Sequence, residues 1–123
     1  WGHTFPTVEH AYQWKKFSDA DLDVANQIRN ANSPEAVKRI SEKNKAPDEW
    51  HQAKVAVMEE ILRAKAAQHE DVREVLQKTG SKRIVENSPG DSFWGCGSDG
   101  KGENHVGHIW MRVRDGLTGK LKN

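Results

Sequence analysis

The sequence predicts a mainly α-helical protein with little or no sheet, folded as one compact domain over residues 1–123. Three observations lead to this fold class. Apolar residues recur at the three- and four-residue spacing of amphipathic helices, and helix-capping residues precede several of these runs. Only residues 81–87 have a strand-like pattern, and their Ile84-Val85 pair is too short to assign. A length of 123 residues matches a single domain.

The first predicted helix covers residues 8–17. Thr7 is a suitable N-cap, and Glu9 falls in the first turn, where the helix dipole favours a carboxylate. Glu9, Gln13 and Lys16 are spaced i, i+4, i+7, so they share one polar stripe. The neighbouring stripe is aromatic and expected to be buried, and it consists of His10, Trp14 and Phe17.

Four more helices are predicted in the middle of the chain, over residues 19–32, 33–43, 49–69 and 70–80. Ser33 at the N-cap and Pro34 at the first helical position are a strong start signal for the second of these. The longest has an apolar face formed by Trp50, Val57, Met58, Ile61 and Leu62. The last is expected to end at Gly80.

Residues 88–104, here called the glycine loop, are predicted to be irregular. Asn104 is the expected N-cap of a final helix. The apolar residues of that helix recur at helical spacing, and they are Val106, Ile109, Trp110, Val113 and Leu117. The total is therefore five to six helices.

Composition limits the function classes. A formal charge of +1, from 19 basic and 18 acidic residues, gives no electrostatic case for a dedicated nucleic-acid binder. The single cysteine, Cys96, permits no intrachain disulfide, which fits a reducing, cytoplasmic compartment. No apolar run approaches the roughly 20 residues of a membrane span, and no signal-peptide pattern is present. The sequence starts at Trp1, and we expect a segment upstream of it.

The glycine loop spells two nucleotide-binding motifs that its context excludes. Gly95-x-Gly97-x-x-Gly100 has the dinucleotide spacing, but the residues after Gly100 form one helix and leave no room for a returning strand. Gly95-x4-Gly100-Lys101 has the P-loop spacing, but Gly102 stands where Ser or Thr would hold magnesium.

No metal site is predicted. The Asp19, Asp21 and Asp23 pattern lacks the glycine and the closing glutamate of a calcium loop. His105 and His108 lie one helical turn apart without an evident third ligand.

The glycine loop nevertheless has the features of an anion site. Gly100 and Gly102 free the backbone to expose N–H groups, and the helix that begins at Asn104 adds bare amides. Lys101 contributes a cation, and Trp94 offers a stacking face. Together these features suit a phosphorylated, base-bearing small molecule. The alternative is a tight turn whose glycines adopt positive φ.

Two segments resemble the signature patterns at the two ends of NADAR-family sequences, a family also called YbiA-like. Residues 5–17 are similar to its pattern of Ser/Thr-x-Glu-His, Gln and Lys-Phe, with matches at Thr7, Glu9, His10, Gln13, Lys16 and Phe17. Residues 91–117 are similar to its aromatic, glycine-rich pattern, with matches at Asp91, Phe93, Trp94, Gly95, Gly100, Gly102, Asn104, Gly107, Met111 and Arg114. Cys96 departs from the Asp that bacterial relatives often carry, and the family's upstream Phe-Ser-Asn-Phe-like stretch is absent.

The resemblance implies a YbiA-like helical fold and an N-glycosidase that breaks the C–N bond at the anomeric carbon of a 5-phosphorylated ribose. Our first expectation is removal of ADP-ribose from guanine, in a nucleoside or in modified DNA or RNA. The alternatives are hydrolysis of phosphorylated riboflavin-biosynthesis intermediates and non-catalytic binding of ADP-ribose or an NAD derivative. No cofactor, metal or membrane partner is expected, and no oligomeric state is predicted.

This chemistry requires a carboxylate near the ribose and a proton donor or cation near the leaving base. The expected catalytic residues are Glu9, Lys16 and Asp91. Lys16 is a candidate to neutralise a phosphate, to protonate the base or, when desolvated, to attack the anomeric carbon of an opened sugar. The expected substrate-binding residues are His10, Gln13, Trp94, Gly95, Gly100, Lys101, Gly102 and Asn104.

Overall fold

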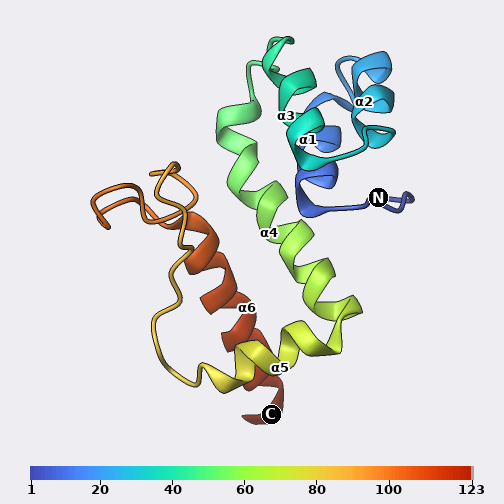
Figure 1. Ribbon diagram of the computed structural model, residues 1–123. Helices are drawn as coiled ribbons and strands as arrows, with labels where there is room; N and C mark the ends of the chain where they lie inside the picture. Colours follow the sequence, from blue (N-terminus) through green and yellow to red (C-terminus); the bar gives the residue numbers. More distant parts are fainter. Residues whose placement is uncertain (123) are drawn as a thin grey trace. The chain divides into compact units, whose positions relative to one another are not determined.

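The computed structural model describes residues 1–122, and their side chains through Leu117. Within this range it contains six helices and no strand, which confirms the predicted fold class (Figure 1). The helices are α1 (Val8–Phe17), α2 (Leu22–Arg29), α3 (Pro34–Glu42), α4 (Trp50–Gln68), α5 (Glu70–Lys78) and α6 (His105–Lys122). Residues 81–87, the only strand-like segment, follow no regular secondary structure.

The chain divides into two compact parts, each described here by itself. The N-terminal part is Trp1–Ile61 and the C-terminal part is Leu62–Asn123, so the division falls within α4. The single domain expected from the sequence stays a prediction. None of the helices in residues 1–122 is both long enough and apolar enough to cross a lipid bilayer.

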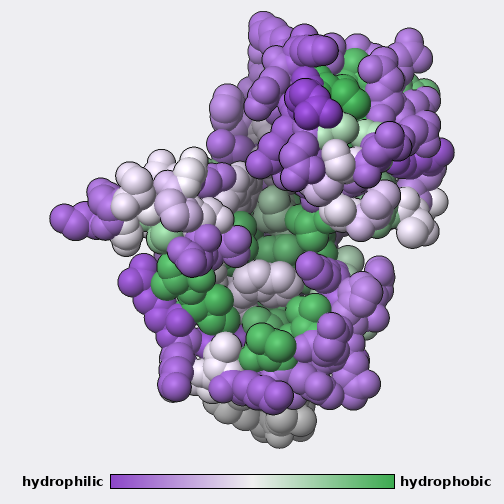
Figure 2. Space-filling model, in the orientation of Figure 1, coloured by the Kyte–Doolittle hydropathy of each residue, from purple (hydrophilic) through white to green (hydrophobic). Residues whose placement is uncertain are grey.

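Helices α1, α2 and α3 pack against one another in the N-terminal part (Figure 1). Each begins at a capping side chain, because Thr7, Asp21 and Ser33 accept hydrogen bonds from amides in the first turn. Their shared core consists of Trp14, Phe17, Val24, Ala25, Ile28 and Val37. Burial of each large apolar side chain contributes about 1.5–3 kcal/mol, so this core stabilises the packing of α1 against α2 and α3. The surface over α1–α3 is mostly hydrophilic (Figure 2).

Helices α5 and α6 pack together in the C-terminal part. Leu76 on α5 and Ile109 and Val113 on α6 are buried, as the helical spacing of the α6 residues predicts. The buried Arg114 guanidinium donates to the Thr79 hydroxyl at 2.9 Å and to the Lys82 carbonyl at 2.6 Å. These bonds attach the end of α5 and the segment that follows it to α6.

Candidate functional site

A polar relay, defined here as Glu9, Gln13, Ser41 and Lys16, connects α1 to α3. Gln13 Nε2 donates to Glu9 Oε1 at 3.0 Å, and Ser41 Oγ donates to Gln13 Oε1 at 2.8 Å. Lys16 Nζ then donates to Ser41 Oγ at 3.2 Å. The stripe of acid, amide and amine predicted on the first helix is therefore joined through hydrogen bonds.

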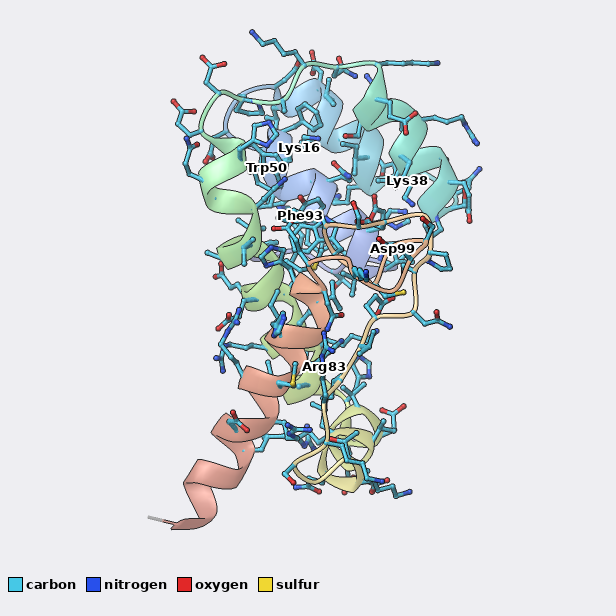
Figure 3. The ribbon with its side chains drawn as sticks, turned by 90° about the vertical axis from the view of Figure 1, so that its left-hand side faces the viewer. Lys16, Lys38, Trp50, Arg83, Phe93 and Asp99 are labelled. Carbon is cyan, nitrogen blue, oxygen red and sulfur yellow. The ribbon has the colours of Figure 1, made fainter. Side chains whose placement is uncertain are left out.

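Lys16 has a perturbed amine. Partial burial lowers the pKa of Lys16 from its usual value near 10.5, because desolvation disfavours the ammonium form. The Glu9 carboxylate raises the pKa and the Lys54 ammonium lowers it, and the net shift is downward. The Nζ atom also lies 5.4 Å from the centroid of the Phe17 ring. An ammonium with a lowered pKa is a better proton donor near neutral pH, and its neutral form is more accessible as a base or nucleophile. Figure 3 labels this side chain on α1.

Ser41 was not expected from the sequence, although a signal for it exists. It is only 5% exposed, and it follows the fully buried Val37 by four residues on α3. A small hydroxyl at i+4 from a core residue lies on the buried face of its helix and needs a polar partner. Gln13 supplies that partner.

The structure corrects the prediction that His10 binds the substrate. Its side chain is 1% exposed, and its Nε2 donates to the Ala31 carbonyl at 2.9 Å. A carbonyl only accepts, so Nε2 carries the hydrogen and Nδ1 accepts from the Thr7 hydroxyl at 2.7 Å. Both ring nitrogens are thus used inside the N-terminal part. His10 holds α1 to the end of α2, and the structure does not present it to a substrate.

The predicted aromatic stripe is confirmed. Trp14 and Phe17 are buried with His10. Trp14 is covered by Trp1, whose ring stacks on it at 6.2 Å, and by Phe5 at 5.3 Å.

Asp91 organises the start of the glycine loop in the C-terminal part. Its Oδ1 accepts hydrogen bonds from the amides of Phe93 at 3.0 Å and Trp94 at 2.8 Å. Its carbonyl accepts from the amide of the buried Gly95 at 3.2 Å. This geometry gives the carboxylate a structural role in the turn, and its catalytic role stays a prediction.

Trp94 lies in an aromatic group at this turn. Its ring is perpendicular to that of Phe93, at 4.7 Å between centroids, and the His105 ring lies 4.3 Å from Phe93. Trp94 is half-buried. The structure therefore fixes the indole by edge contacts, and base stacking on its face stays a prediction. Figure 3 shows Phe93 and, further along the irregular segment between α5 and α6, Asp99.

The backbone amides of Gly100, Gly102 and Asn104 all donate to carbonyls of the loop, which corrects the prediction that they are exposed to an anion. The Gly102 amide donates to the Cys96 carbonyl at 2.6 Å, and the Asn104 amide donates to the Gly95 carbonyl at 3.0 Å. The Gly100 amide makes a longer bond of 3.4 Å to the Gly97 carbonyl. These three amides are thus bonded within the loop, and a phosphate that binds them would have to replace these bonds.

The start of α6 is closed in the same way. The amides of His105 and Val106 donate to the carbonyls of Phe93 at 3.1 Å and Trp94 at 3.0 Å. The Lys101 amide is bonded to Asp99 Oδ1 at 2.9 Å, while its residue is exposed. Of the phosphate contacts predicted in the glycine loop, the Lys101 ammonium is the one that needs no backbone rearrangement.

Asn104 precedes α6 but does not cap it with its side chain. Its φ is +54°, it is 1% exposed, and its Nδ2 donates to the Ile84 carbonyl at 2.9 Å. Its Oδ1 accepts from the Glu86 amide at 2.8 Å. One turn later, any Cβ at Gly107 would collide with the Ile84 carbonyl and the Asn104 amide group. Asn104 is therefore a structural link to residues 84–86, and its predicted contact with substrate is not supported.

Local geometry explains two glycines of the loop. A Cβ at Gly102 would stand 2.5 Å from the Gly95 carbonyl oxygen, and the φ of Gly100 is +74°. These positions require glycine for a close approach and for a left-handed backbone. The tight-turn alternative thus accounts for them without a ligand.

Among the residues that the structure describes, no group of three or more His, Cys, Asp or Glu side chains is arranged to hold a metal ion.

Comparisons with known proteins agree along nearly the whole chain. The model of the NADAR domain family matches residues 1–118. The chain is 43% identical to the N-glycosidase Npun_R5314 of Nostoc punctiforme, over 94% of this chain and 76% of that protein. It is 34% identical to the chloroplastic riboflavin biosynthesis protein PYRR of Zea mays, over 96% of this chain and 20% of that protein. The NMR structure of the E. coli protein YbiA is 35% identical and superposes with a TM-score of 0.88, over 99% of this chain and 73% of that one.

Proposed function

The chain belongs to the NADAR family, and we propose that it is an N-glycosidase that hydrolyses the bond between a phosphorylated ribose and a base. The observation that carries the proposal is the polar relay. It holds a carboxylate, Glu9, and an amine with a lowered pKa, Lys16, on one stripe of α1. The name of the Nostoc relative, an N-glycosidase, supports the same reaction class.

The proposed substrate is ADP-ribosylated guanine, as a nucleoside or within a nucleic acid, and the product is ADP-ribose. An exposed Lys101 and a half-buried Trp94 suit a ligand with both phosphate and base. A second candidate is a phosphorylated riboflavin-biosynthesis intermediate, which the name of the maize relative favours. Both substrates contain the same kind of C–N bond, so the chemistry proposed for α1 serves either.

Glu9 is proposed to act at the ribose. As the C–N bond lengthens, positive charge develops on the anomeric carbon, and a nearby carboxylate stabilises it. Water adds to that carbon and forms the new C–O bond, and its proton passes to the carboxylate. The hydrogen bond from Gln13 Nε2 fixes the Glu9 carboxylate for both tasks.

Lys16 is proposed to act at the leaving base. The electron pair of the breaking bond goes to the base nitrogen, and a proton from the Lys16 ammonium neutralises it. Burial lowers the pKa of Lys16 and so makes this transfer easier near neutral pH. The amine then takes a proton from solvent, and the Glu9 carboxyl releases to solvent the proton that it took from water. Both side chains thus return to their starting forms.

The test is hydrolysis of both substrates by one enzyme preparation. We expect release of ADP-ribose from ADP-ribosyl-guanosine by the wild type and at least a hundredfold lower rate in Glu9→Gln, which keeps the shape of the side chain. Full activity of Glu9→Gln would overturn the assignment of the carboxylate. Turnover of the riboflavin intermediate alone would favour the second substrate. ADP-ribose binding by calorimetry without turnover of either substrate would instead indicate a binding module.

A further inference from the structure

We propose that Ser41 is a positioning residue, which holds the Lys16 amine in one orientation relative to the Glu9 carboxylate. The inference rests on the proposed function, because Lys16 and Glu9 are the residues assigned to the reaction there. Ser41 is on α3, whereas both of those residues are on α1. The packing of α3 against α1 thus contributes a residue to the chemistry.

The direction of every hydrogen bond in the polar relay is determined by Glu9. A carboxylate only accepts, so Gln13 must turn its Nε2 toward Glu9 and its Oε1 toward Ser41. That amide oxygen takes the single hydroxyl hydrogen of Ser41. The Ser41 oxygen is then left as an acceptor, and Lys16 Nζ donates to it at 3.2 Å. One N–H of the Lys16 amine is thereby fixed, and the other substituent positions on Nζ point away from Ser41.

Burial makes this arrangement specific. Ser41 is 5% exposed and Gln13 is 9% exposed, so water competes little for either. The charged groups that act on the Lys16 amine are Glu9 on its own helix and Lys54 on α4. Ser41 is the neutral acceptor that α3 supplies to the same amine.

Replacement of Ser41 by alanine should have a kinetic effect that loss of stability alone does not produce. We expect kcat to fall by up to about a hundredfold with little change in KM, because the amine is misplaced while substrate contacts remain. The lost acceptor stabilised the ammonium form, so the pKa of Lys16 should fall further. The limb of the pH–rate profile that reports this group moves to lower pH, whichever of its forms is active. Ser41→Thr keeps the hydroxyl and should restore most of the rate.

Ser33→Ala is the matched control on the same helix. The Ser33 hydroxyl caps α3 by accepting from the Ala36 amide at 3.1 Å, and it takes no part in the polar relay. We expect this variant to lower Tm while the pH–rate profile keeps its wild-type position. An equal shift of that profile in Ser33→Ala and Ser41→Ala would overturn the proposal.

A titration without substrate separates this inference from the proposed function. The protein is labelled with lysine enriched in ¹³C at Cε, and the Lys16 signal is assigned by its loss in Lys16→Arg. We expect its titration midpoint to be lower in Ser41→Ala than in the wild type or Ser33→Ala. If Ser41→Ala does not fold, Ser41→Cys, which is similar in size and weaker in hydrogen bonding, should give a smaller shift in the same direction. An unchanged midpoint in a folded Ser41 variant would refute the role of Ser41, even for a wild type that hydrolyses neither substrate.

Discussion

Replacing Asn104 should destabilise the C-terminal part substantially, because its side chain bonds residues 84–86 to the start of α6. In Asn104→Ala the Ile84 carbonyl and the Glu86 amide lose their partners. Both belong to half-buried residues, so each loss costs about 1 kcal/mol, at the lower end for unsatisfied groups. The φ of +54° adds about 1 kcal/mol, because alanine tolerates the left-handed region less well than asparagine. The sum is about 3 kcal/mol of unfolding free energy.

Urea unfolding measures this loss, and Asn104→Gly separates its two causes. With an m-value of about 1.5 kcal/mol/M, 3 kcal/mol lowers the midpoint by roughly 2 M. Glycine accepts the positive φ but makes neither hydrogen bond, so Asn104→Gly should lose only about 2 kcal/mol. Destabilisation below about 0.5 kcal/mol in Asn104→Ala would refute the proposed link between the Asn104 side chain and residues 84–86.

Two further predictions concern the proposed active residues. Burial of the Lys16 ammonium destabilises the folded protein, and it places the native pKa of Lys16 below the unfolded value near 10.5. As pH rises through the native pKa toward 10.5, the folded protein loses this proton first, so the destabilisation is relieved. The unfolding free energy of the wild type should therefore rise relative to that of Lys16→Met across this window, and a difference that does not change with pH would contradict the lowered pKa. Trp94→Ala should raise KM for a base-bearing substrate by roughly tenfold, as expected for a lost stacking contact of about 1.4 kcal/mol. Trp94→Phe keeps an aromatic ring and should retain most of the affinity. Equal KM values of the two variants in steady-state assays would argue against stacking.

The helices were predictable because their signals are local. Thr7 and Ser33 cap their helices as the sequence predicts, and Pro34 begins α3. Glu9 and Gln13 were correctly placed on one stripe because helical spacing alone brings them together. Ser41 follows Gln13 by 28 positions, and their contact depends on how α3 packs against α1. Sequence spacing contains no such information.

The glycine loop was harder to predict for a related physical reason. Glycine at positions such as 100 and 102 permits an unusual backbone, but the sequence does not say whether the freed amide meets water, a ligand or a carbonyl. Here the Gly102 amide meets the carbonyl of Cys96. Asn104 was expected to cap α6 because asparagine favours that position, yet its amide group bonds residues 84–86 instead. The N-cap preference of asparagine correctly predicted that Asn104 precedes α6, but it predicted the wrong hydrogen-bond partners for the side chain.

The two candidate carboxylates differ in what a reaction would require of them. Asp91 Oδ1 accepts hydrogen bonds from the backbone amides of Phe93 and Trp94, so moving this carboxylate toward a substrate would open the turn that carries both residues. Glu9 Oε1 accepts from a side-chain amide that is itself held by Ser41, and α1 retains its backbone hydrogen bonds whatever Glu9 does. A carboxylate that changes protonation during each turnover is better supported by a helix than by a turn that depends on its charge. This difference favours Glu9 over Asp91 as the carboxylate that acts at the ribose.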